Sequence, residues 1–181
     1  MIRRAAFIVC LGVAAASAAG CASSRALDQS VSDIGANAEL KAVLFADRSQ
    51  DYSDVDITMY EGRLMLSGGV RTEEGRRRLI ENAWKANGVK QVIDEIFVGD
   101  KTPFAQGVED GRIDAALRAK FINDGVVKSG RIKTSVSAGV VYLLGVAPDQ
   151  ASLDRAIDIA RGMSGVKAVV SHILIADAAA N

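Results

Sequence analysis

Cysteine, histidine and aromatic residues are scarce in this chain of 181 residues, and each scarcity excludes a class of function. With two cysteines and one histidine, the chain lacks the thiolate and imidazole ligands of a structural zinc site. Only 5% of the residues are aromatic, which argues against the base-stacking platforms of proteins that bind single-stranded nucleic acid. The formal net charge is zero, so no overall basic field attracts nucleic acid. We therefore expect no metal, no cofactor and no nucleic-acid partner.

The N-terminus carries the longest apolar run of the chain. Arg3 and Arg4 precede the stretch AAFIVCLGVAAASAAG, which ends immediately before Cys21. A short positive region, an apolar stretch and small residues before a cleavage point are typical of a secretory signal. The run is also shorter than the roughly 20 residues that a membrane-spanning helix needs. We predict that residues 1–20 form a signal peptide.

The residues before Cys21 resemble a bacterial lipobox, in which the cysteine thiol is lipidated and becomes the first residue of the mature chain. Ala18 stands where leucine is usual, followed by Ala19 and Gly20. A plain signal-peptidase site with an incidental thiol is the alternative. Lipidation is favoured because a lone thiol in an oxidising compartment needs an explanation. Ala22 follows in place of aspartate, which by analogy with bacterial sorting indicates the periplasmic face of the outer membrane.

An internal repeat runs through the rest of the chain at a constant offset of 77 residues. The phrase NGVKQV at 87–92 returns as SGVKAV at 164–169. The same register aligns 33–98 with 110–175 without a gap, and it keeps three glycines and the apolar pattern, which chance does not produce. The chain therefore contains two copies of one fold of about 65–70 residues. Identical pairs include Asp33/Asp110, Leu40/Leu117, Gly62/Gly139, Gly68/Gly145, Arg78/Arg155, Ala83/Ala160, Gly88/Gly165 and Lys90/Lys167.

The first half of each copy reads as a helix followed by a β-hairpin. Asp33 and Asp110 are suitable N-caps for the helix. Apolar residues then recur at helical spacing, whereas the next segment alternates apolar and polar residues as a half-buried strand does. Gly62 and Gly139 fall where a hairpin turn needs a positive φ. The apolar helix positions are Leu40 and Leu44 in the first copy and Ile113, Leu117 and Phe121 in the second.

The second half of each copy reads as a helix followed by a last strand. Thr72 and Asp149 stand at helix starts. Gly88 and Gly165 are expected to end these helices as C′ glycines in the left-handed region. The last strands are expected at 92–98 and 169–175. The inward helix positions are expected to be Leu79, Ile80 and Ala83, and in the second copy Leu153, Ile157 and Ala160.

This order of elements, with its glycines and its GV–V helix exit, resembles the BON domain. Two copies behind a lipobox resemble the dual-BON outer-membrane lipoproteins. The resemblance implies an α+β fold in which each copy is helix–strand–strand–helix–strand, with a three-stranded mixed sheet covered by two helices. It also implies a periplasmic envelope protein that is not an enzyme, contacts phospholipid and supports outer-membrane integrity. We expect a lipid-anchored tether at 21–32, BON domains at 33–99 and 110–176, a linker at 100–109 and a tail at 177–181.

No arrangement of residues in the sequence predicts a catalytic site. The only histidine, His172, lies in a strand where it is expected to point away from its own helices, at the surface or between the repeats. The basic run 76–78 is more typical of a solvated helix face with acidic neighbours than of an anion site. Trp84 is expected to pack in its own core or against the other repeat, and Tyr60 and Tyr142 could do the same.

The charge of the two copies favours the second as the lipid-binding one. Residues 33–99 have a net charge of −3, whereas residues 107–181 have +1, and anionic headgroups attract basic residues. The resemblance indicates the first helix of the second copy, with Arg112 where an exposed aromatic residue would be a natural membrane wedge. Three alternatives stay open: an ordinary amphipathic helix, a helix whose Ile122 covers the other repeat, and a protein-binding adaptor for envelope assembly. The predicted phospholipid-binding residues are Arg112, Ala115, Arg118, Ala119 and Ile122.

Overall fold

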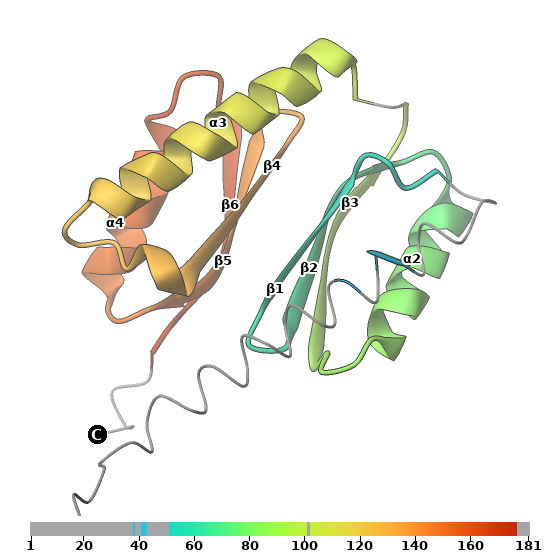
Figure 1. Cartoon of the computed structure of the whole chain (residues 1–181), viewed down its shortest axis with the longest axis horizontal. Helices are drawn as coiled ribbons and strands as arrows, with labels where there is room; N and C mark the ends of the chain where they lie inside the picture. The colour runs from blue at the N-terminus through green and yellow to red at the C-terminus, as the bar shows by residue number, and fades with distance from the viewer. Residues whose placement is uncertain (1–37, 39–40, 43–50, 101, 177–181) are drawn as a thin grey trace, which may run out of the picture.

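The computed structural model describes residues 38, 41–42, 51–100 and 102–176 (Figure 1). This part of the chain is α+β, with two three-stranded mixed sheets and three α-helices. The first repeat contributes β1 (Val55–Tyr60), β2 (Arg63–Val70), α2 (Glu73–Lys85) and β3 (Gln91–Val98). The second contributes α3 (Phe104–Asn123), a short 3-10 turn (Ser129–Arg131), β4 (Ile132–Ser137), β5 (Val140–Ala147), α4 (Gln150–Arg161) and β6 (Ala168–Ile175).

The two sheets have the same topology and the same register. In each, the first strand pairs antiparallel with the central strand, and the last strand pairs parallel with it. Val55 lies opposite Gly68, and Ile132 lies opposite Gly145, which reproduces the offset of 77 residues. The predicted repeat and its mixed sheets are confirmed. Of the expected first helix of the first copy, residues 38, 41 and 42 are described and are helical, whereas Leu40 and Leu44 lie outside the described residues.

Each hairpin closes through two residues with positive φ. Glu61 and Gly62 have φ values of 51° and 80°, and Ala138 and Gly139 have 52° and 82°. Two consecutive positive φ angles define the type I′ turn, whose twist matches that of the flanking strands. The glycine at the second position was predicted at both turns, and the structure confirms it.

A second matched pair of glycines permits a close backbone approach. Gly68 and Gly145 have φ values of 109° and 153°. A Cβ atom on Gly68 would lie 2.0 Å from the carbonyl oxygen of Asp54, and one on Gly145 would lie 2.1 Å from that of Arg131. The residue before β1 or β4 therefore approaches the central strand so closely that only glycine leaves room.

Helices α2 and α4 begin where the sequence predicts. The Thr72 hydroxyl accepts a hydrogen bond from the Gly75 amide at 3.0 Å, and the Asp149 carboxylate accepts one from the Ser152 amide at 2.7 Å. The prediction for their ends is wrong, because α2 stops at Lys85 and α4 at Arg161, before the two glycines. Gly88 and Gly165, with φ values of 79° and 89°, instead form the turns into the last strands.

The N-cap residue of α4, Asp149, makes the stability of the protein depend on pH in the acidic range. The hydrogen bond from the Ser152 amide holds the pKa of Asp149 below its usual value. A carboxylate whose pKa is depressed by folding stabilises the protein above its unfolded pKa of about 4, and this contribution is lost as the pH falls further. We expect Asp149→Asn to keep a capping side chain but to show a smaller drop in melting temperature between pH 5 and pH 2.5. An unchanged drop, measured by circular dichroism, would contradict this assignment.

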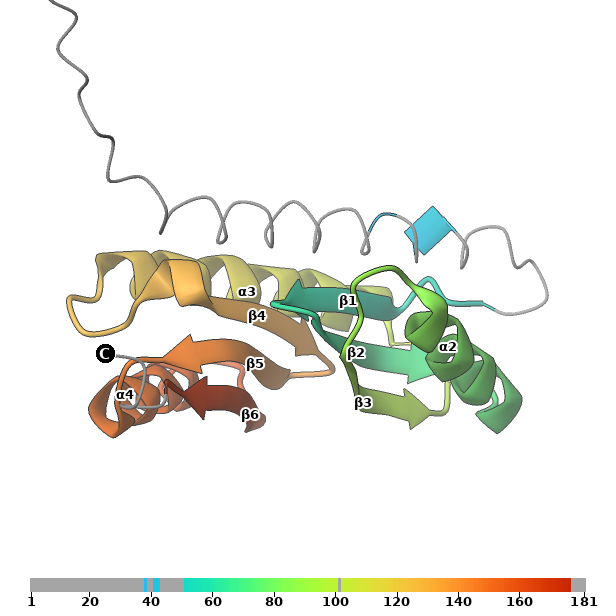
Figure 2. The same ribbon diagram turned by 90° about the horizontal axis from the view of Figure 1, so that it is seen from below.

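The helices lie on the outside and the sheets face each other (Figure 1). One core fills the space between α2 and the first sheet, and a second lies between α3, α4 and the second sheet. A third apolar cluster joins the two sheets. Figure 2 shows β1 beside β4 along this contact. In the second repeat, two helices cover one face of the sheet, as predicted. The third cluster contains Tyr60, Met65, Ile93, Tyr142 and Leu144.

Candidate functional site: the outer face of α3

Helix α3 is longer than the sequence predicted. It begins at Phe104, after Pro103, and Asp110 is a buried residue inside it. The prediction that Asp110 caps this helix is therefore wrong. Its carboxylate reaches across to the β4–β5 turn, where it accepts hydrogen bonds from the amides of Ala138 at 2.7 Å and Gly139 at 2.9 Å. Asp110 thus fixes the position of α3 on the sheet.

The additional turns give α3 an exposed apolar face. Phe104 is 89% exposed, Val108 58% and Ile122 70%. At 100° per residue these side chains fall, together with Ala115 and Ala119, within an arc of about 60° along about 27 Å of helix. The expectation that Ile122 covers the other repeat is therefore wrong. The opposite side of the helix buries Ile113, Leu117 and Phe121, as predicted.

Two arginines flank this apolar face, and each is paired with an acid on its own helix. The Arg112 guanidinium lies 2.6 Å from a Glu109 carboxylate oxygen, and this hydrogen-bonded pair lowers the pKa of Glu109. Arg118 lies 2.8 Å from Asp114 and also donates to the carbonyl oxygen of Thr134 at 3.2 Å. Both arginines are exposed, so the cations remain accessible to an anion that competes for them.

Phe104 is an exposed aromatic residue at the start of α3, where the sequence had indicated none. It was missed because placing the cap at Asp110 assigned 100–109 to a linker. Two signals could have revealed it: Pro103 stands where a helix commonly begins, and the spacing from Phe104 through Val108 and Ala115 to Ile122 is helical. The structure therefore brings all five predicted residues to one exposed surface and adds Phe104 and Val108 to it.

A groove of about 530 Å³ lies beside this face, between α3 and α4. Lys120, Asp124, Arg155 and Asp158 bring both signs of charge to its wall. Arg155 pairs with Asp124 at 2.8 Å, and the Asp124 carboxylate also accepts two backbone hydrogen bonds, which lower its pKa. The groove wall therefore presents no excess of positive charge to an anion.

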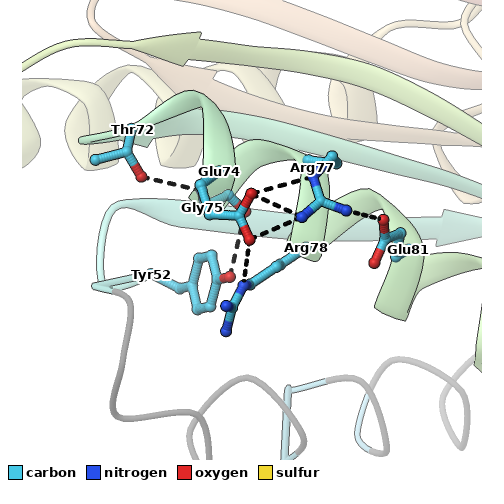
Figure 3. A network of polar contacts seen from close by, with 7 residues as sticks. All are labelled: Tyr52, Thr72, Glu74, Gly75, Arg77, Arg78 and Glu81. Atoms are coloured by element: carbon cyan, nitrogen blue, oxygen red, sulfur yellow. Dashed lines mark hydrogen bonds and ion pairs between the residues drawn. The ribbon is translucent and has the colours of Figure 1, made fainter.

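Arginines of the basic run on α2 form ion pairs with acidic residues of the same helix (Figure 3). Arg77 bridges Glu74 at 2.7 Å and Glu81 at 2.6 Å, and Arg78 contacts Glu74 at 2.7 Å. The predicted solvated helix face is confirmed. The expectation for Trp84 is wrong, since this side chain is 54% exposed on α2.

The remaining singled-out residues lie between the repeats. Tyr60 and Tyr142 are buried in the cluster that joins the sheets. The Nε2 atom of His172 lies 2.7 Å from an Oε1 atom of Glu95 in the first repeat, so His172 points away from its own helices as predicted. In the described residues, no group of three or more acidic, histidine or cysteine side chains could hold a metal ion. None of the described helices is long and apolar enough to span a bilayer.

The geometry defines a tandem α+β protein in which two copies of one unit join through their sheets. The family model described as "BON domain" matches residues 32–100 and 109–177, so the chain belongs to the BON-domain family.

Three relatives each match most of this chain. The "Outer membrane lipoprotein DolP" of Haemophilus influenzae is 34% identical over 64% of this chain and 60% of its own length. The "Osmotically-inducible protein Y" of Escherichia coli is 29% identical over 78% of this chain and 71% of its own. An "Uncharacterized protein in gshII 5'region" of Anaplasma centrale is 32% identical over 67% of this chain and 82% of its own.

Proposed function

We propose that this protein is a non-enzymatic lipoprotein, anchored through Cys21 to the periplasmic face of the outer membrane. It binds anionic phospholipid through α3 of its second BON domain and thereby supports the integrity of that membrane. The similarity to a protein named as an outer-membrane lipoprotein supports the location. The apolar N-terminal run and the lipobox-like residues before Cys21 support the anchor. Mass spectrometry of the mature N-terminus tests the lipidation, and an unmodified Cys21 would exclude it.

The observation that carries the lipid proposal is the exposed face of α3. Phe104, Val108 and Ile122 form an apolar line on the surface, and Arg112 and Arg118 stand on its two sides. A helix that lies in the interface of a bilayer buries such a line among the acyl chains while its cations meet the headgroups. Binding to the bilayer surface would cover the apolar side chains that water now contacts. The tether would raise the local concentration of the helix at the membrane, so that a weak contact suffices.

We expect the double change Arg112→Glu and Arg118→Glu to weaken binding to vesicles at least about tenfold. The reversal turns attraction to anionic headgroups, worth about 1 kcal/mol for each cation near the surface, into repulsion. Flotation of residues 25–181 with vesicles of anionic and neutral lipid measures the bound fraction. Binding of the unchanged protein should require anionic lipid and decline with salt. Equal binding by the double variant would reject this surface.

Three further variants separate the charge from the apolar face. Arg71→Glu with Lys85→Glu makes the same charge change on exposed residues of the first repeat and should leave binding unaltered. Glu109→Gln removes the partner of Arg112 and should strengthen binding. Phe104→Ser keeps every charge and should weaken binding to anionic vesicles at all salt concentrations. Circular dichroism confirms that each variant is folded.

A protein-binding adaptor is the second candidate, and the edge of the second sheet supports it. Strand β6 pairs only with β5 among the described strands, and Leu174 and Ile175 near its end are exposed. An extended segment of an envelope protein could add to such an edge. If residues 25–181 fail to bind anionic vesicles even at low salt, this second function replaces the first.

A further inference from the structure

The contact between the two sheets brings together equivalent positions of the two repeats. At the offset of 77 residues, Met65 corresponds to Tyr142 and Ile93 to Val170. All four side chains belong to the cluster that joins the sheets. An interface in which the same surface is used by both partners is isologous, as in a symmetric dimer. The chain thus contains, between its own repeats, the kind of contact that two identical domains could also make.

One polar contact in this interface joins a residue to its own equivalent. Glu95 corresponds to His172, and the Nε2 atom of His172 lies 2.7 Å from the carboxylate of Glu95. Both side chains are partly buried. Burial and the nearby Glu95 carboxylate raise the pKa of Tyr142, which places a third side chain of the interface near this pair. A residue touches its equivalent only near the axis that relates the two copies, so this position would meet itself in any symmetric pairing that reproduces this contact between sheets.

The apolar part of the interface distinguishes little between possible partners, because both sheets present large apolar side chains. The position held by Glu95 in the first repeat and His172 in the second, which lies near the axis, distinguishes the possible partners sharply. Two first repeats from different chains would set Glu95 against Glu95, and like charges directly opposite each other are destabilising. Two second repeats would set His172 against His172, without a carboxylate to accept the hydrogen bond. A first repeat against a second repeat instead sets the imidazole against a carboxylate, which is a stronger acceptor than a second imidazole and carries no like charge.

We propose that Glu95 and His172 are specificity determinants that direct the first BON sheet onto the second BON sheet and disfavour pairing of like repeats from two copies. The favourable contact and the repulsion between like residues act at the same position, which is how specific interfaces commonly separate correct from incorrect partners. This inference does not depend on lipid binding, since neither residue lies on α3.

The change His172→Glu tests the proposal, because it creates within one chain the Glu–Glu contact that like repeats would make. Ser67 and Ser135 provide the reporter: their hydroxyl oxygens lie 2.9 Å apart, buried between the sheets. In the full chain with Cys10 and Cys21 changed to serine, Ser67→Cys and Ser135→Cys should form a disulfide when the sheets are closed. The effective concentration of the two thiols, measured against glutathione, then reports how firmly the two sheets are held together.

We expect His172→Glu to lower this effective concentration about fivefold, the effect of a lost favourable pair and an added repulsion. The exchange variant Glu95→His with His172→Glu should return it to within about twofold of the parent. His172→Gln, which can still donate a hydrogen bond, should have a small effect. Melting temperatures of the same variants without the cysteine pair should follow the same order. If His172→Glu equals the parent, or if the exchange variant is as impaired as His172→Glu, the proposal is wrong.

Discussion

Gly145→Ala is expected to destabilise the second repeat by about 3 kcal/mol or more. The new methyl group would lie 2.1 Å from the carbonyl oxygen of Arg131 and 2.9 Å from the Cα atom of Ile132. Both obstacles are backbone atoms, so no side-chain rotation can relieve the clash. The φ value of 153° is also one that alanine rarely adopts. Urea unfolding should show the change as a lower midpoint or as loss of the folded state.

Gly111→Ala is the matched control, and it should raise the free energy of unfolding, whereas Gly145→Ala should lower it. Gly111 lies on the exposed side of α3, and a Cβ atom there meets no neighbouring atom within 4 Å. Alanine stabilises a helix interior by about 0.5–1 kcal/mol relative to glycine. The same substitution is therefore expected to raise the free energy of unfolding at one site and to lower it sharply at the other. Equal effects at Gly111 and Gly145 would show that the close approach of the Arg131 carbonyl to Gly145 tolerates a side chain.

Local signals allowed the repeat, its strands and its helix starts to be predicted from the sequence. The hairpin glycines at 62 and 139 and the caps at Thr72 and Asp149 depend on a few neighbouring residues and on backbone geometry. Such features can be inferred from one sequence because their energetics involve only the adjacent turn. The repeat strengthened each inference, since a signal found in one copy could be checked in the other.

The start of α3 could not be predicted correctly, because a distant contact determines the role of Asp110. The residue type is a good cap, and the repeat retains it, but its partners lie on the β4–β5 turn, 28 and 29 residues away. The same limit applies to Trp84, which was expected to pack in its own core or against the other repeat. Whether α2 turns it toward a core or toward water depends on where the first sheet lies.

Only part of the candidate site on α3 could be inferred from the sequence, because distant contacts also determine where this helix begins. Arg112, Ala115, Arg118, Ala119 and Ile122 follow from helical periodicity once the buried side of α3 is identified. Phe104 and Val108 could be assigned to the same face only once the structure showed that α3 begins at Phe104. The pairing of the repeats was beyond the sequence, because His172 and Glu95 are 77 residues apart and each looks like an ordinary polar residue on a strand. Their equivalence in the repeat becomes informative only when the sheets are seen to face each other.

Asp110→Ala is expected to lower the free energy of unfolding by about 3 kcal/mol. It leaves the amides of Ala138 and Gly139 without their acceptor, and an unsatisfied buried donor costs about 1–3 kcal/mol. Asp110→Asn keeps one side-chain oxygen as an acceptor and should have an intermediate effect. Asp154→Ala on α4 is the control, because that carboxylate is exposed and its change should stay within about 0.5 kcal/mol.

The effect of Asp110→Ala should also extend to the surface of α3. The hydrogen bonds to the β4–β5 turn hold the first half of the helix against the sheet, and that half carries Phe104 and Val108. Hydrogen exchange should therefore increase in the first turns of α3 more than around Ile122, where Leu117 and Phe121 still pack in the core. Vesicle binding should weaken even though no residue of the exposed face has changed. A variant that loses stability uniformly along α3 would show that the packed side chains position the helix and that Asp110 does not.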